Sequence, residues 1–325
     1  MPPDLADLTE TLVSLTPNQW LGIPVALAGA VFLALGAQFQ HRGVVKVEEK
    51  TTDADGGLNP TQLLLLLRRP SWVAGSLMLG LAVLLQLTSL FLAPIIVVQP
   101  LGAIALVITA LVNARVAKHA IDGPILRAIV LCIAGVGIFV VIATLFARSA
   151  PVSDLQLGVI LSLLGVVSIG WALAFVFLRH RFSALGYIVG AGVLYGFVAT
   201  LAKVVIDRAK TGDFEWLTVL CVVALLAAAV LGGYFVQNAY ANGPPDLVIA
   251  GLTVIDPIVA IGIGVVVLGE ASEVPLWASV LFVLCATVAI WGVVLLSKHH
   301  PQAAAERGRT AAPGAGSASG PPSGD

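Results

Sequence analysis

The residues best suited to chemistry in this sequence are an acid and a proline inside a long apolar run. If that run forms a helix across a membrane, Asp256 lies about 15 Å into a bilayer about 30 Å thick, where a carboxylate is costly and serves a function. Pro257 cannot donate a backbone hydrogen bond, which frees the carbonyl of Thr253, four residues earlier. A carboxylate beside a free carbonyl suits a hard cation or a proton, and Asp256 is also the one residue that we consider as a metal ligand. The alternative is a neutral aspartate that caps a helix kink.

A second dipeptide repeats this arrangement with a neutral amide in place of the acid. Gln99 precedes Pro100 inside another apolar run, and Pro100 frees the carbonyl of Ile96. We predict that Pro100 and Pro257 mark helix breaks that face one cavity, where Gln99 and Ile96 contribute to binding a solute or a coupling ion. Gln99 could equally form a hydrogen bond to a neighbouring helix.

Three further polar residues inside apolar runs are secondary candidates. Gln86 and Gln237 are suited either to lining a cavity or to bonding between helices. Tyr195 could stack on an organic cation, although packing is the commoner role of a single aromatic side chain.

Three more secondary candidates lie near the ends of apolar runs. We expect Lys203 to extend its ammonium group into water, beside a solvated helix end that contains Asp207. We expect Glu270 to be a solvated carboxylate that could attract cations to an entrance. Asn113 ends an earlier run.

Signatures of catalysis are missing from the sequence. There is no phosphate-binding loop, nucleophile elbow or pair of catalytic carboxylates. Cys132, Cys221 and Cys285 each lie in an apolar run, where a small buried side chain is the ordinary interpretation. Lys and Arg form no basic patch of the kind that binds nucleic acid. We therefore expect no enzyme, no cofactor and no nucleic-acid partner.

The composition indicates the environment in which these residues must be positioned. Of 325 residues, 58% are hydrophobic and 11% are charged. Soluble domains carry about 25% charged residues, and one core cannot hide so large an apolar excess. The bilayer is therefore the expected partner of most of the surface, and we predict a multi-pass protein of the plasma membrane.

Apolar runs long enough to cross a bilayer predict an all-α membrane protein with nine transmembrane helices. The runs are continuous and lack the alternation of a membrane barrel. They cover about 20–40, 72–93, 95–116, 125–147, 155–178, 184–206, 216–240, 246–268 and 275–297.

The positions of Lys and Arg predict how the helices are oriented. Most of the 17 basic residues fall in alternate polar segments, which places the N-terminus outside and the C-terminus inside. On this prediction residues 1–19 are extracytoplasmic, residues 41–71 form a cytoplasmic loop, and residues 299–325 form a disordered cytoplasmic tail.

A spacing of prolines indicates an internal repeat of opposite orientation. Pro94, Pro100 and Pro124 span thirty residues, and Pro245, Pro257 and Pro275 later in the chain span the same number. One shift superposes Gln99 on Asp256 and Asn113 on Glu270. We predict two inverted repeats, of four helices in residues 20–147 (the first half) and five in residues 148–298 (the second half), with a binding site between them. Because both repeats lie in one chain, a monomer or a homodimer is expected.

Three segments resemble a known family. Residues 68–116, and above all the AP…VQPLGA core at 93–103, resemble the NIPA-type magnesium transporters of the drug/metabolite transporter (EamA-like) superfamily. Residues 22–45 are similar to the first helix of that family, and residues 256–270 to the wider superfamily. The resemblance implies a secondary transporter that moves a small solute, such as Mg²⁺ or another divalent cation, by alternating access.

Two other functions remain open. The family pattern has a glutamate in the second helix, whereas this chain has no acid between Gly80 and Gln86. This difference favours a proton-coupled exporter of small organic metabolites or drugs. The third alternative is a non-transporting membrane scaffold or a partner of a lipid-carrier flippase, for which Asp256 and Gln99 would be dispensable.

Overall fold

A computed structural model describes residues 17–48, 68–116, 123–149, 152–178, 184–212, 215–242 and 245–298 of the chain. These residues are helical, with short connecting segments and no strand among them. The elements are α2 (Pro17–Glu48), α4 (Pro70–Leu92), α5 (Ile95–Val98), the 3-10 helix η1 (Gln99–Gly102), α6 (Ala103–Val116), α7 (Gly123–Phe146), α8 (Asp154–Leu178), α9 (Ala184–Thr211), α10 (Trp216–Asn242), α11 (Pro245–Val266) and α12 (Leu276–Lys298).

Nine helical spans of the described residues are long and apolar enough to cross a membrane, which confirms the predicted number and the all-α class. The third span, Ile95–Val112, is assembled from α5, η1 and most of α6. Helix α2 continues to Glu48, and its apolar span ends at Gln40, immediately before the predicted loop. Hydropathy predicts where a helix leaves the hydrocarbon core of the membrane. It does not predict where the helix itself ends, because a helix can continue into water. The predicted N-terminal segment up to residue 16, most of the 41–71 loop and the 299–325 tail lie outside the described residues.

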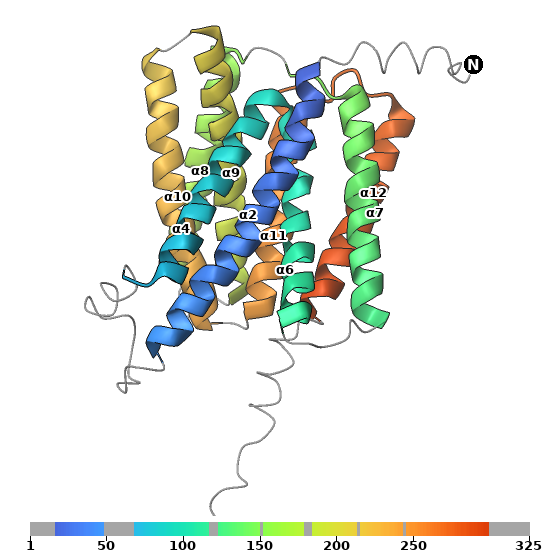
Figure 1. Cartoon of the computed structure of the whole chain (residues 1–325). Coiled ribbons are helices and arrows are strands. Elements are labelled where there is room, and N and C mark those ends of the chain that lie inside the picture. Colours follow the sequence, from blue (N-terminus) through green and yellow to red (C-terminus); the bar gives the residue numbers. More distant parts are fainter. Residues whose placement is uncertain are drawn as a thin grey trace, which may run out of the picture.

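The helices lie side by side along a roughly common direction (Figure 1). Helix α2 begins at one end of the bundle and α12 ends at the other, as an odd number of crossings requires. Large apolar side chains such as Phe177, Val266 and Leu276 are about four-fifths exposed, at 79%, 81% and 83%. A surface covered in this way is suited to lipid, and the chain is a multi-pass membrane protein.

Packing between the helices follows a few close pairs. Helix α2 packs along α4, α9 packs against both α10 and α11, and α7 packs along α12. The backbones of α7 and α12 touch, because a Cβ atom at Gly292 would lie 2.5 Å from the backbone nitrogen of Cys132. A Cβ atom at Gly135 would lie 2.6 Å from the backbone nitrogen of Ala289. Glycine is required at both places for this approach.

Glycines of α9 allow a similarly close contact with α11. A Cβ atom at Gly192 would lie 2.7 Å from Ile255, and one at Gly196 would lie 2.6 Å from Val259. Because Gly192 and Gly196 have no side chains, the backbones of α9 and α11 approach each other closely near Asp256.

Candidate functional site

Helix α11 holds Asp256 in a half-buried position, with one of its carboxylate oxygens fully buried. The helix continues through Pro257, and the Oδ1 atom of Asp256 is buried with no hydrogen-bond partner among the described residues. A buried polar atom without a partner costs free energy, and an ionised one costs more. An ionised carboxylate in this position therefore carries a free-energy cost that no described side chain offsets.

Two neighbouring helices complete the surroundings of Asp256. A Cβ atom at Gly196 of α9 would lie 3.0 Å from the backbone oxygen of Asp256. Tyr195, the preceding residue of α9, interacts electrostatically with Asp256. The ring of Tyr195 packs over Gly232 of α10, where a Cβ atom would lie 3.1 Å from the ring. The interface of α9, α10 and α11 thus brings together an acid and a phenol that are far apart in sequence.

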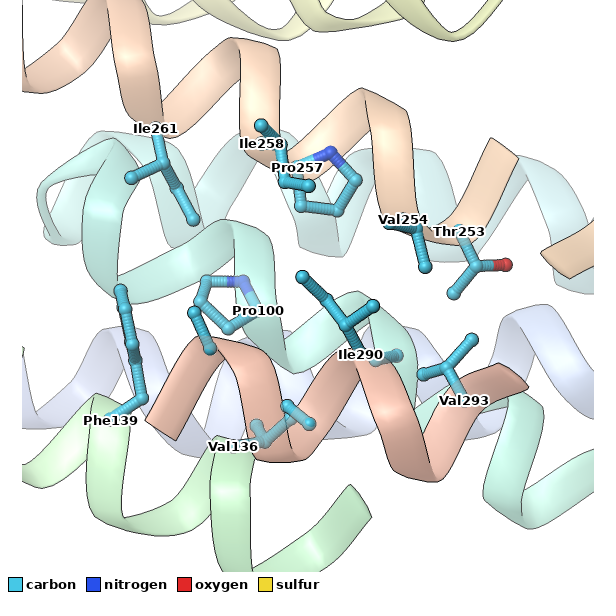
Figure 2. A pocket seen from close by; sticks show the side chains of 13 residues that line it. Pro100, Val136, Phe139, Thr253, Val254, Pro257, Ile258, Ile261, Ile290 and Val293 are labelled. Carbon is cyan, nitrogen blue, oxygen red and sulfur yellow. The ribbon is translucent and has the colours of Figure 1, made fainter. Parts of the chain in front are cut away.

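Pro100 and Pro257 line one pocket, but α11 continues through Pro257, so the prediction of a helix break at Pro257 was wrong. Pro100 of η1 and Pro257 of α11 both turn into it, together with Thr253 and the ring of Phe139 (Figure 2). The pocket contains about 470 Å³ of space, including its open mouth. Its other lining residues are Ala103, Val136, Val254, Ile258, Ile261, Ala286, Ala289, Ile290 and Val293, so the wall is apolar.

The residues before the two prolines do not share this pocket wall. Successive side chains of a helix point about 100° apart, so Asp256 turns away from the direction of Pro257 and lies beside α9. Gln99 is buried at 6% exposure in the 3-10 turn. The hydroxyl of Thr253 donates to the carbonyl of Ile249 at 2.8 Å, within its own helix. The two prolines line the pocket, whereas Asp256 is not among its lining residues.

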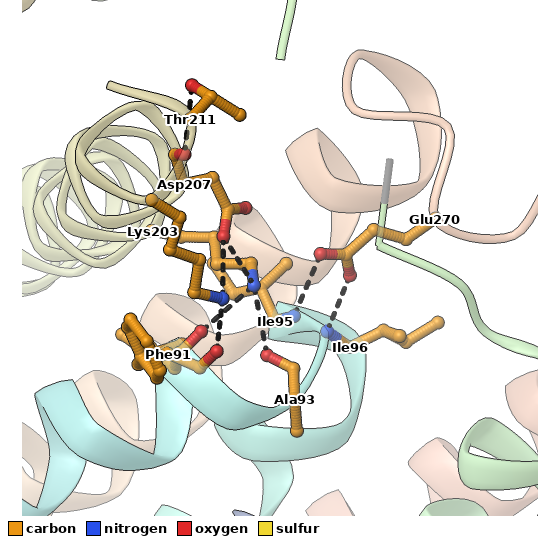
Figure 3. Close-up of polar contacts among 10 residues, drawn as sticks. Phe91, Ala93, Ile95, Ile96, Lys203, Asp207, Thr211 and Glu270 are labelled. Carbon is orange, nitrogen blue, oxygen red and sulfur yellow. Dashed lines mark hydrogen bonds and ion pairs between the residues drawn. The ribbon is translucent and has the colours of Figure 1, made fainter. Parts of the chain in front are cut away.

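A second polar cluster lies where α4 ends and α5 begins (Figure 3). Glu270, in the segment between α11 and α12, accepts hydrogen bonds from the backbone N–H groups of Ile95 and Ile96, each at 2.9 Å. It is only 2% exposed, so the expectation of a solvated carboxylate was wrong. Burial raises the pKa of the Glu270 carboxyl to about 7, against the lowering effect of these two N–H groups and of Lys203. The break before α5 supplies the N–H groups that make this burial possible.

Lys203 of α9 is buried on the other side of the same break. Its Nζ donates to the carbonyl oxygens of Leu90 at 2.9 Å and Ala93 at 3.1 Å, and it forms an ion pair with Asp207 at 3.2 Å. Lys203 is 1% exposed and Asp207 is 8% exposed. The expectations of an ammonium group in water and of a solvated helix end were therefore wrong. The unpaired carbonyls at the end of α4 hold the lysine inside.

The remaining candidates do not converge on either cluster. Gln86 is half-buried on α4, and Gln237 lies on the exposed face of α10 rather than in a cavity. The side chain of Asn113 lies outside the described residues. Within the described part of the chain, no group of three or more His, Cys, Asp or Glu residues could hold a metal ion. Any ion at Asp256 would need backbone, phenol or water oxygens as its other ligands.

A bundle of membrane-spanning helices with a buried acid beside a central pocket is the architecture of a membrane transporter. The sequence model of the family described as "Magnesium transporter NIPA" matches residues 18–182, and the chain belongs to that family. An uncharacterized protein of Corynebacterium glutamicum is 29% identical over 285 residues, which cover 86% of this chain and 95% of that protein. No solved structure matches the chain.

Proposed function

We propose that this protein carries Mg²⁺ or another divalent cation across the plasma membrane, with Asp256 as the residue that binds the ion. Membership of the magnesium transporter family is the observation that carries the proposal. The buried Oδ1 atom of Asp256, which has no hydrogen-bond partner in the described part of the chain, supports it from the structure. A hard cation prefers carboxylate and carbonyl oxygens, and Mg²⁺ retains several of its own waters.

We infer that the other ligands come from the surroundings of Pro100 and Pro257. The hydroxyl of Tyr195 and the carbonyl of Thr253 are the candidates from the second half. Gln99 and the carbonyl of Ile96 are the candidates from the first half. In this arrangement an ion between the halves would be reached through the pocket of Figure 2.

The transport cycle that we propose is alternating access between two inverted halves, residues 20–147 and 148–298, with the N-terminus outside. The packing pairs support such a repeat: α2 packs on α4 and α6 in the first half, as α9 packs on α10 and α11 in the second. Helix α7 packs on α12, its counterpart under the same shift. Pro100 and Pro257, which that shift superposes, line the same pocket.

A proton-coupled exporter of small organic solutes is the second candidate, and the pocket itself favours it. The wall around Pro100 and Pro257 is apolar and includes Phe139, which suits an organic solute better than a hydrated ion. In that case Asp256 would bind the coupling proton.

Proteoliposomes that contain a trapped magnesium-sensitive dye test the proposal. We expect an inward Mg²⁺ gradient to raise the dye signal in vesicles with the protein and not in empty vesicles. Mn²⁺ with a matching dye tests another divalent cation. No influx of either ion, combined with efflux of organic cations driven by a proton gradient, would replace the cation proposal with the exporter. No transport of any kind would favour the scaffold.

A further inference from the structure

The turn between α4 and α5 leaves two helix ends inside the protein. Helix α4 ends at Leu92, and α5 begins at Ile95 after Pro94. The last carbonyls of one helix and the first N–H groups of the next have no partners within their own helices. Ala93, Ile95 and Ile96 are at most 1% exposed, so these groups cannot bind water freely. They need partners from elsewhere in the chain.

Two charged side chains of the second half supply those partners, and each has the favourable sign. The ammonium group of Lys203 binds the carbonyl end of α4, where the helix dipole is negative. The carboxylate of Glu270 binds the N–H end of α5, where the dipole is positive. Lys210, one helical turn or so beyond Asp207, adds a contact to the carbonyl of Phe91. The turn is thus held from both sides (Figure 3).

The backbone around Glu270 fixes the position of its carboxylate. Gly269 has a φ angle of 70°, which favours glycine, and the N–H of Glu270 donates to the carbonyl of Gly264 at 3.0 Å. The carbonyl of Glu270 accepts a hydrogen bond from the N–H of Arg148, also at 3.0 Å. Gly264 leaves room for the docked turn, because a Cβ atom there would lie 2.5 Å from Ile95.

We propose that Lys203 and Glu270 form a latch that closes the outer mouth of the carrier by holding the turn at Ala93–Pro94 of the first half against the second half. This inference rests on the proposed function, because only a carrier with two moving halves needs a latch. The turn lies at the end of the bundle where α9 ends, which the distribution of Lys and Arg predicts to be outside.

Charged contacts are suited to such a latch because the charged groups can be paired with the helix ends in one state and solvated by water in the other. In the closed state the two charges satisfy the helix ends. In an open state water can solvate both the charges and the freed backbone groups, which offsets part of the cost of exposing buried side chains such as Ile95 and Ile96. Closed and open states can then differ by a small free energy, which a transport cycle requires.

A cysteine in the pocket reports whether the outer mouth is open. The reporter is Ala103→Cys, in a chain whose three buried native cysteines are replaced with alanine. A membrane-impermeant maleimide is added to right-side-out and to inside-out vesicles.

With the latch intact we expect slow labelling from outside. Lys203→Met and Glu270→Gln are each expected to accelerate it about tenfold, the effect of losing a charge-assisted hydrogen bond. The matched control is Glu273→Gln, which removes an exposed acid from the same segment and is expected to leave the rate unchanged.

The side of labelling separates a latch from a general loosening of the structure. Acceleration only in right-side-out vesicles is the expected result. Equal acceleration from both faces, acceleration only in inside-out vesicles, or rates equal to the Glu273→Gln control would overturn the proposal. If Lys203→Met does not fold, the nearly isosteric Glu270→Gln decides alone. The labelling readout requires no transported ion. If labelling supports the latch while the protein transports no Mg²⁺, the cation proposal is rejected and the latch proposal stands.

Discussion

Replacing Asp256 with asparagine is expected to lower cation influx by about two orders of magnitude or more, while the protein still folds and inserts. Asparagine has nearly the same size and can still form hydrogen bonds, but it carries no charge. A divalent cation in a buried site depends on that charge, because few other anionic ligands are within reach among the described residues. The initial rate of Mg²⁺ influx into proteoliposomes measures the effect.

Stability measurements distinguish this loss from misfolding. The Oδ1 atom of Asp256 has no hydrogen-bond partner in the described structure, so a neutral amide should leave the thermal stability in detergent equal or higher. Mg²⁺ should raise the melting temperature of the wild type and not that of Asp256→Asn, because only a bound ion stabilises the folded state. The control is Glu273→Gln, an exposed neutralisation that should keep both influx and the Mg²⁺ effect. Wild-type influx in folded Asp256→Asn would refute the role of this acid.

Gly292→Ala is expected to disrupt the contact between α7 and α12 and to reduce the amount of folded protein sharply. The added Cβ would lie 2.5 Å from the backbone nitrogen of Cys132 and 2.9 Å from its Cα, and a backbone cannot turn aside as a side chain can. Overpacking of this kind costs about 1–3 kcal/mol, and we expect the upper end here. The melting temperature and the monodisperse fraction in detergent measure the effect.

Helix α7 itself provides the control for this prediction. A Cβ atom at Gly137 would meet nothing within 4 Å, whereas one at Gly135, on the same helix, would lie 2.6 Å from the backbone nitrogen of Ala289. Gly135→Ala should therefore resemble Gly292→Ala. Gly137→Ala should be neutral or more stable by about 0.5–1 kcal/mol, the usual gain of alanine over glycine in a helix. Equal stability of all three variants would contradict a close backbone contact between α7 and α12.

Properties that depend on a single stretch of chain could be predicted from the sequence. The nine spans follow from runs of apolar residues, and the depth of Asp256 follows from its place within one run. The family resemblance rested on contiguous motifs such as the core at 93–103, and the family match confirms it. Pro100 and Pro257 line one pocket, as expected from the prediction that the two prolines face one cavity.

The tertiary structure decided what depends on residues far apart in the chain. Lys203 and Glu270 look like solvated helix ends in the sequence, because their partners lie more than a hundred positions away, at separations of 113 and 175. These partners are backbone groups, namely the carbonyls of Leu90 and Ala93 and the N–H of Ile95. Residue types in the sequence do not reveal which backbone groups are left unpaired. The direction of Asp256, toward α9 and Tyr195 and away from the pocket wall, depends on how α11 is rotated against its neighbours. Hydropathy along one chain determines which segments enter the membrane, whereas the pairing of their unsatisfied groups is determined only when the helices pack.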